Sequence, residues 1–143
     1  MSGLEALYTA LYSYLLNAGG WGAIVYPDEV DIDATTPYLH YFVVAAGALN
    51  ERVKIDDFEA VLTIKCVSPD STVAMTGADE ISALLDNHGA QDYGEGQLAM
   101  PPGSGWEVLT ITKERRIQQV VRHDKSGALY ESGNQYRFRM EAV

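Results

Sequence analysis

Apolar residues occupy every second position over residues 58–67, which is the period of a β-strand. Ser68-Pro69-Asp70 follows directly and gives this strand a clear end. We therefore expect a strand whose apolar face packs against the rest of the fold. That face carries Phe58, Ala60, Leu62, Ile64 and Cys66, and the mixed face carries Glu59, Val61, Thr63, Lys65 and Val67.

A first helix is predicted near the start of the chain, where apolar residues recur at steps of three and four. Ser2 stands three residues before Glu5, which is the spacing of a capping box. Gly19-Gly20 supplies the end of the helix. The apolar stripe comprises Leu4, Leu7, Tyr8, Leu11, Tyr14 and Leu15.

A second helix is predicted after the strand, with Asp70 or Ser71 as its cap and Gly89 as its end. Gly77 weakens the first half of this helix, so a later start with Thr76 as the cap is an alternative. We expect both helices to pack on the apolar face of the 58–67 strand.

Further strands are predicted from the same alternation of apolar and polar residues. The strand over residues 38–46 is apolar on both faces, so we expect part of it to be covered twice. The last strand has a predicted interruption near Gly133-Asn134. The other predicted strands lie over residues 21–26, over 106–112 and 117–121 as one long bent strand or two, and over 128–142.

These elements predict an α+β fold: a mostly antiparallel sheet, two helices packed on one face, and a long β-hairpin arm around residues 47–57. The 143 residues suffice for one domain, residues 1–143, with a core that needs no metal or disulfide. Cys66 is the only cysteine, which fits a buried thiol in a reducing cytosol. Without a signal-peptide pattern or an apolar run of about 20 residues, we expect a soluble protein.

The chain shows little sign of catalytic or ligand chemistry. Its net charge of −10 opposes binding to a phosphate backbone. His40, His88 and His123 have no metal-ligand spacing. The acidic loop after residue 27 lacks the glycine and closing glutamate of a calcium loop, and residues 90–105 lack the Lys-Ser/Thr of a phosphate loop. We expect no enzyme activity, no metal and no cofactor.

Half of the ten basic residues are arginines in the last third of the chain. The structural interpretation is that they pair across strands with Glu107, Glu114 and Glu131. The alternative is a patch that meets an acidic partner. The arginines are Arg115, Arg116, Arg122, Arg137 and Arg139.

Several short motifs in a fixed order resemble a known family of structural proteins. A Leu/Tyr helix is followed by Ile24-Val25-Tyr26-Pro27, an acidic spacer and Pro37-Tyr38-Leu39-His40-Tyr41. Ser68-Pro69-Asp70, Ile81-Ser82-Ala83-Leu84-Leu85 and Tyr136-Arg137-Phe138 complete the series. This order is similar to that of the tail terminator or tail-completion proteins of tailed bacteriophages.

The resemblance implies a virion protein that assembles in the host cytoplasm as a homo-oligomeric ring, typically six-fold, on the end of the tail tube. Such a ring stops tube polymerisation and offers a joining surface to the neck or head-completion protein. DNA passes through it without specific binding, and no membrane is involved. The alternatives are a neck or head-completion adaptor, or a small cytosolic ligand-binding or enzymatic α+β domain with a pocket beneath residues 90–105.

The same hypothesis suggests which residues make subunit or partner contacts. Arg52 and Lys54 lie in the predicted hairpin arm. The mixed strand face, with Glu59 and Lys65, is left for neighbouring subunits or the lumen, so Lys65→Glu is expected to leave the monomer folded and disturb assembly. Tyr93, Leu98 and Met100 are expected to become buried only against a neighbour, and Arg115 and Arg116 complete the set.

Overall fold

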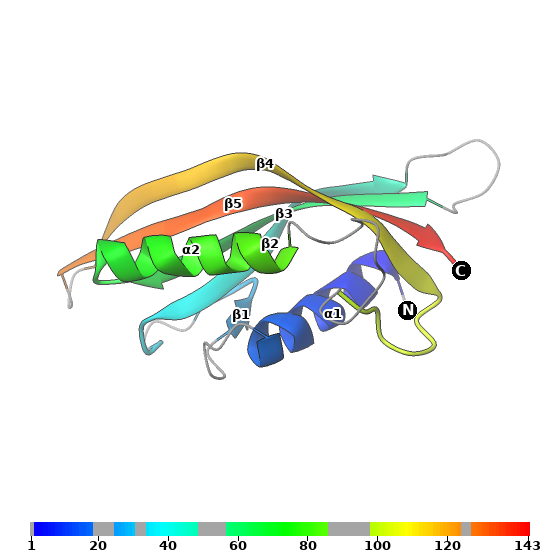
Figure 1. Cartoon of the computed structure of the whole chain (residues 1–143), viewed down its shortest axis with the longest axis horizontal. Coiled ribbons are helices and arrows are strands. Elements are labelled where there is room, and N and C mark those ends of the chain that lie inside the picture. The colour runs from blue at the N-terminus through cyan, green and yellow to red at the C-terminus, as the bar shows by residue number, and fades with distance from the viewer. Residues whose placement is uncertain (1, 19–24, 31–33, 49–56, 86–97, 124–126) are drawn as a thin grey trace.

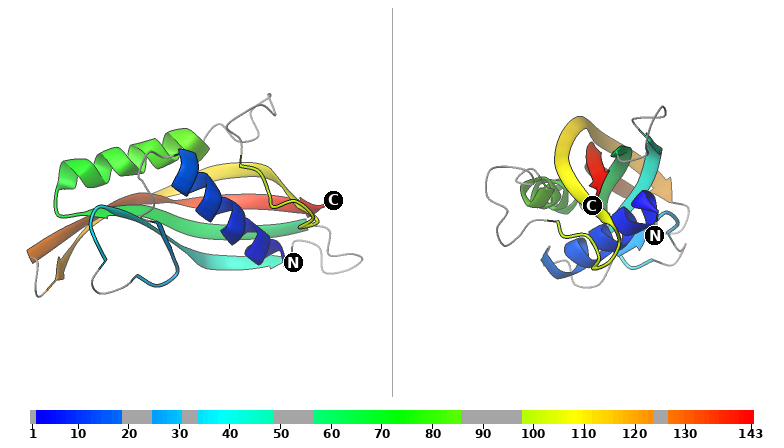
Figure 2. Two further views of the ribbon diagram at one scale, coloured as in Figure 1. Left: turned by 90° about the horizontal axis from the view of Figure 1, so that it is seen from below. Right: turned by 90° about the vertical axis from the view of Figure 1, so that its right-hand side faces the viewer.

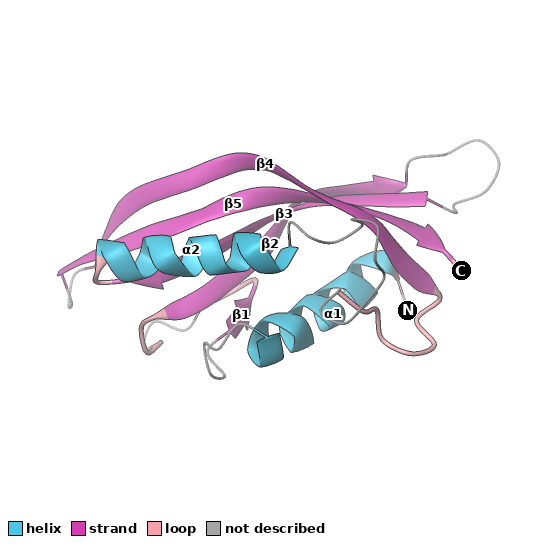
Figure 3. Cartoon of the chain, viewed as in Figure 1, coloured by secondary structure: helices cyan, strands magenta, loops and turns pink. Residues whose placement is uncertain are grey.

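The computed structural model describes residues 2–18, 25–30, 34–48, 57–85, 98–123 and 127–143. It has two helices, α1 (Gly3–Ala18) and α2 (Ser71–Leu85), and one five-stranded sheet (Figures 1 and 3). The sheet is mostly antiparallel, and only β1 and β2 run parallel. The predicted α+β class is confirmed. In sheet order, the strands are β1 (Val25–Pro27), β2 (Tyr38–Ala48), β3 (Asp57–Ser68), β5 (Gly127–Ala142) and β4 (Trp106–His123).

The central strand of the sheet is β3, which contains the alternating stretch 58–67. Leu62 lies between Val43 of β2 and Tyr136 of β5 in the ladder. The apolar face of β3 is buried together with residues of α1 and α2. Figure 2 shows where the two helices lie beside the strands. One hydrophobic cluster therefore joins the helices to the sheet; it includes Leu7, Leu11, Leu15, Leu39, Tyr41, Leu62, Ile64, Cys66, Ile81, Leu85, Tyr136, Phe138 and Met140.

The helix starts follow the predicted capping residues. Ser2 N donates to Glu5 Oε2 at 3.1 Å, and Glu5 N donates to Ser2 Oγ at 3.2 Å, which is a reciprocal capping box. Asp70 caps α2, because its Oδ1 accepts Thr72 N at 2.8 Å. The alternative start at Thr76 is therefore wrong. The predicted ends of both helices, at Gly19-Gly20 and Gly89, lie outside the described residues.

β5 runs without interruption through Gly133-Asn134, contrary to the sequence prediction. A Cβ at position 133 would lie 2.1 Å from Ile64 O and 2.6 Å from Lys65 Cα. Glycine is therefore present because β3 and β5 approach each other closely there, and not because the strand breaks.

β4 is one strand of 18 residues with two bulges, between Val108 and Thr110 and between Lys113 and Arg115. Of the two predicted readings, the single bent strand is correct. β2 and β3 form the predicted hairpin, although its tip, residues 49–56, lies outside the described residues.

The mixed face of β3 is mostly buried by the chain itself, which corrects the expectation that it is left for neighbours. Val61, Thr63 and Val67 are buried on this face. The reason is that long side chains of β2, β4 and β5 lie across it. Lys65 pairs with Glu131, and Arg137 pairs with both Glu59 and Glu114.

The corresponding face of β2 is less covered than its apolar sequence predicts. Tyr38, His40 and Phe42 are half-buried on this face, and Val44, at a bulge between Val43 and Ala45, is 52% exposed. Among the described residues, no second layer covers this strand. Its apolar side chains instead contact one another and their neighbours: Tyr38 packs edge-on against Tyr26, and His40 packs against Phe42.

Candidate subunit interface

β4 is the outermost strand of the sheet and, within the described part of the chain, pairs only with β5. Bulges and charged side chains are devices that keep edge strands from pairing indiscriminately. Both occur here, and the two bulges bracket a short regular stretch that contains Thr110 and Thr112. Both threonines are exposed. This stretch is the part of the β4 edge best suited to pair with another strand.

The other long edge belongs to β2, and the chain covers its first half. β1 pairs with residues 39–41, and Asp28 N donates to Tyr41 O at 2.8 Å. Val43 N then donates to Tyr8 Oη at 2.9 Å. Beyond this point, the stretch Val44-Ala45-Ala46-Gly47 is exposed and uncharged. An exposed apolar strand edge favours contact with another chain.

These two open stretches lie at the same level along the strands. Following the ladder across the sheet from Ala45 leads through Val61 and Arg137 to Thr112. β2 and β4 also run in opposite directions, because three antiparallel steps separate them. A rotation about an axis parallel to the strands would therefore bring β4 of one copy alongside β2 of the next as an antiparallel pair.

The β4 edge carries basic side chains near the second bulge. Lys113 Nζ donates to Ser82 Oγ of α2 at 3.1 Å. Arg116 Nη1 lies 3.6 Å from Asp79 Oδ1 of α2, and these two side chains are 47% and 72% exposed. Arg115 is exposed on the same strand. This edge therefore presents positive charge in a chain whose net charge is −10.

At the opposite edge, α1, Asp28 and β2 surround a cavity of about 400 Å³. Asp28 has φ 60°, and its Oδ1 accepts a hydrogen bond from Tyr8 Oη at 2.6 Å. Burial, together with this bond, raises the pKa of Tyr8 to about 12. Glu5 also lines the cavity. The cavity therefore has two carboxylates at its wall and a tyrosine that stays protonated at neutral pH.

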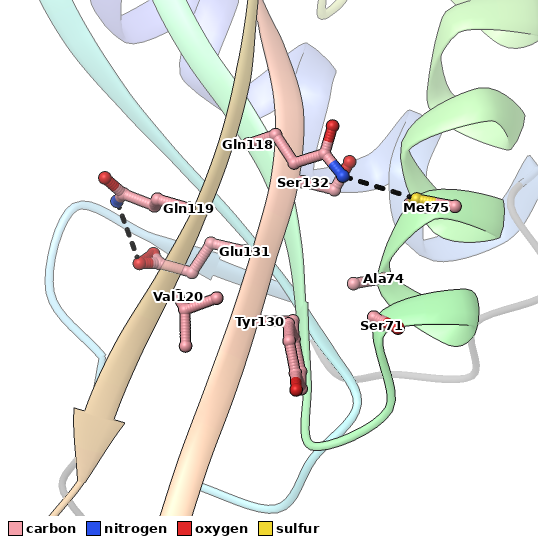
Figure 4. A pocket seen from close by; sticks show the side chains of 9 residues that line it. All are labelled: Ser71, Ala74, Met75, Gln118, Gln119, Val120, Tyr130, Glu131 and Ser132. Atoms are coloured by element: carbon pink, nitrogen blue, oxygen red, sulfur yellow. Dashed lines mark hydrogen bonds between the residues drawn. The ribbon is translucent and has the colours of Figure 1, made fainter.

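A second cavity, of about 250 Å³, lies between the start of α2, the end of β4 and the start of β5 (Figure 4). Met75 and Val120, both exposed, form its apolar walls. Gln118 Nε2 lies 3.4 Å from Met75 Sδ, which is a weak acceptor. Ser132 also lines the cavity, and its buried Oγ has no hydrogen-bond partner among the described residues. This site could take a small neutral group that bears an acceptor.

The structure separates the predicted contact residues into several groups. Leu98 is buried in the core of its own chain, so the expectation that it needs a neighbour is wrong. Met100 is half-buried against the same cluster, which corrects the same expectation. Both residues lie in a glycine- and proline-rich segment, which suggested an exposed loop. Nothing in the local sequence indicates that Leu98 and Met100 pack against the core. Arg52, Lys54 and Tyr93 lie outside the described residues.

Two predicted contact residues are engaged within the chain. Lys65 pairs with Glu131 and also lies 5.4 Å from the centroid of the Phe42 ring. Glu59 pairs with Arg137. These contacts place both residues in the charged layer over the mixed face of β3. Arg115 and Arg116 are the predicted contact residues that lie on an open strand edge.

The predicted cross-strand pairing of the arginines is correct only in part. Arg137 pairs with Glu114 as predicted. Arg139, however, lies 3.9 Å from Asp57. Glu107 faces Glu141, and this hydrogen-bonded contact raises the pKa of Glu141. The side chain of Arg122 lies outside the described part of the structure.

The histidines and acidic groups form no recognisable metal site where the structure describes them. No cluster of three or more His, Cys, Asp or Glu in those residues could hold a metal ion. His40 Nε2 contacts the carbonyl oxygen of Asp28, and burial lowers the pKa of His40. His88 and the His123 side chain fall outside the described part. None of the described helices has both the length and the apolar character needed to cross a membrane.

Comparison with known proteins supports the fold. No family model and no curated protein matches this chain. Among solved structures, 19 chains are similar. One of these has a TM-score of 0.51 at 15% sequence identity, over 98% of this chain and 92% of its own length. At this low identity, the likeness concerns only the arrangement of helices and strands.

Sequence reasoning missed the features that define the two edges. The role of Tyr8 at the β2 edge depends on its contacts with Asp28 and Val43, which are 20 and 35 residues away in the chain. Sequence reasoning also missed Ser132 in the second cavity, because in the sequence it looks like an ordinary polar strand residue. The small residues Ala45-Ala46-Gly47 could have indicated the β2 edge in the sequence. A strand end without charged side chains, beside a predicted hairpin tip, suggests an edge that another chain covers.

Proposed function

We propose that this protein is a structural tail terminator whose copies form a closed ring on the end of a bacteriophage tail tube. The ring stops tube growth, offers a surface to the neck or head-completion protein and lets DNA pass. The sequence resemblance suggests this role and a six-fold ring. The observation that carries the proposal is the pair of open strand edges on opposite sides of the sheet, at the same level and with opposite strand directions.

This geometry suits a ring because the two edges differ from each other. Contact between unlike surfaces is head-to-tail, and it closes only when successive copies are related by rotation alone. A pure rotation about an axis parallel to the strands does not shift residues along that axis. Ala45 of one copy can therefore meet Thr112 of the next. Closure would also cover every exposed edge, which removes the tendency of such edges to aggregate.

The test is assembly of the purified protein, alone and with tail tubes of the same phage, followed by light scattering and electron microscopy. Wild-type protein should form rings, at least on the tube ends. Thr112→Asp should give a folded protein with no rings, because it places a charge at the centre of the paired edge. Thr76→Asp is the matched control: Thr76 is exposed on α2 and belongs to neither strand edge, so this variant should leave assembly unchanged.

A wild-type protein that stays monomeric in the presence of tubes would refute the proposal. Rings of Thr112→Asp at the wild-type concentration would refute the edge pairing. Electron microscopy of virions labelled with an antibody against this protein distinguishes a terminator from a neck adaptor. A terminator would be labelled at the end of the tail tube, and an adaptor on the portal side.

A second candidate function, binding of a small neutral ligand, is favoured by the buried hydroxyl of Ser132 in the cavity beside Met75 and Val120. A ligand carbonyl could accept from Ser132 Oγ and lie against the apolar walls. N-methylacetamide as a probe, followed by nuclear magnetic resonance shifts of these residues, tests this function. Shifts that persist in Ser132→Ala would argue against it.

A further inference from the structure

We propose that the acidic cavity formed by α1, Asp28 and β2 receives the side chain of Arg116 from the next copy of this chain. The guanidinium would lie between the carboxylates of Glu5 and Asp28. This inference rests on the ring proposed above and deepens it, because it names a specific contact between neighbouring copies.

The cavity has the shape and charge for a long basic side chain. Its volume of about 400 Å³ is bounded by the apolar side chains of Leu4 and Val43 as well as by the two carboxylates. The methylene groups of an arginine can pack on such apolar walls while the charged head remains among polar groups. None of the described lining residues is Lys or Arg, so the negative charge there has no neutralising side chain in the lining.

Both carboxylates retain capacity to accept further hydrogen bonds. Asp28 uses Oδ1 to accept from Tyr8 at 2.6 Å, and Glu5 uses Oε2 to accept from Ser2 N at 3.1 Å. A carboxylate has two oxygens and about four lone-pair sites, so each group can still accept from a guanidinium. The contacts with Tyr8 and Ser2 also hold the two carboxylates in place before a partner arrives, which reduces the entropy lost on binding.

Arg116 is the basic residue best placed to reach this cavity. The ladder leads from Arg116 through Asn134 and Ile64 to Tyr41, and Tyr41 O accepts from the main-chain nitrogen of Asp28 at 2.8 Å. Arg116 and Asp28 therefore lie at the same level on opposite edges of the sheet. A closed ring with its axis along the strands brings residues of equal level together.

Arg116 can leave its contact within the chain at little cost. Its separation from Asp79 is 3.6 Å, and both side chains are largely exposed, at 47% and 72%. Exposed ion pairs of this kind contribute little to stability. A contact shielded between two copies is screened less by salt and water than this surface pair. The positive β4 edge and the acidic cavity thus provide complementary charges on the two unlike surfaces.

The test is a double-mutant cycle on ring assembly with Arg116→Gln, Asp28→Asn and the double variant. Asparagine suits the position because it adopts a positive φ readily, as Asp28 does with φ 60°. Each single variant should lower the apparent association constant about tenfold per contact, which is the effect of losing one favourable interfacial charge pair. The double variant should be no weaker than the weaker single variant.

Asp79→Asn is the matched control, because it removes the partner of Arg116 within the chain but no group of the cavity. It should leave assembly unchanged or strengthen it. Far-ultraviolet circular dichroism and urea melts would show that each variant folds. Rings that form normally in Arg116→Gln and Asp28→Asn, or effects that simply add, would overturn this inference while the ring itself remained. A wild type without rings would instead overturn the proposed function.

Discussion

The ion pair of Lys65 and Glu131 gives a quantitative test of how the charged layer over β3 stabilises the fold. The two side chains are 11% and 10% exposed. Gln119 Nε2 also donates to Glu131 Oε2 at 3.0 Å. Lys65→Met keeps a long apolar side chain but removes the positive charge. Glu131 would then remain nearly buried without this cation, and among the described residues the amide of Gln119 would still donate to it.

The expected loss follows from this burial. Removing one partner of a buried ion pair costs about 3–5 kcal/mol. Because the hydrogen bond from Gln119 remains, we expect the lower end, about 3 kcal/mol. A chain of this length has a total stability of about 7–21 kcal/mol at about 0.05–0.15 kcal/mol per residue. The variant should therefore stay folded, with a Tm lower by about 6–12 °C.

The assay is urea unfolding followed by circular dichroism, on Lys65→Met, Glu131→Met and the double variant. The double variant should recover most of the loss, because a buried pair can be replaced by apolar residues at little cost. Arg139 and Asp57 provide the control cycle. They lie 3.9 Å apart and are 52% and 31% exposed, so their coupling should stay below about 1 kcal/mol.

Equal coupling energies in the two cycles would refute this reasoning, since burial would then make no difference. The same contact also changes the sequence-based expectation for Lys65→Glu. That substitution would place a second carboxylate beside Glu131 in a nearly buried site, so we now expect a strongly destabilised monomer. A loss of assembly in Lys65→Glu therefore says nothing about a subunit contact at this residue.

Three further predictions concern single residues. Gly133→Ala should lower the free energy of unfolding by about 1–3 kcal/mol or more in urea melts, because the new Cβ would lie 2.1 Å from Ile64 O. An unchanged urea midpoint would contradict the close approach of β3 and β5. Cys66 should resist thiol reagents at pH 8 in the native state and react quickly in urea, because burial raises its pKa to about 12; rapid native labelling would show that the strand opens. Glu141→Gln should raise the free energy of unfolding at pH 7 and make it depend less on pH. The pKa of Glu141 in the folded state is raised, mainly by Glu107, so the wild type loses stability as pH rises from 4.5 through that higher value. An unchanged pH profile of stability in the variant would contradict this.

The sequence predicted those features that depend on neighbouring residues. The capping box at Ser2 and Glu5 and the cap at Asp70 are local hydrogen-bonding patterns, and both were confirmed. The alternation over residues 58–67 identified a strand with one core-facing side, because side chains alternate across any strand. Cys66 was correctly placed in the core for the same reason.

Other expectations failed where distant parts of the chain decide burial. The mixed face of β3 looks accessible in the sequence, yet Thr63 is buried because charged side chains from adjacent strands lie across it. Leu98 lies in a loop-like sequence and still reaches the core. Gly133 reads as a break in a strand, whereas it permits two strands to pack closely.

The sequence by itself thus determined the helices, most strands and the acidic character of the chain, since periodicity, caps and charge are written residue by residue. Only the tertiary structure decided the strand order, which makes β4 and the end of β2 opposite edges. It alone also set Arg116 level with Asp28 across the sheet. The physical reason is that register and edge position depend on which distant segments pair, and residues far apart in a chain carry no local record of that choice.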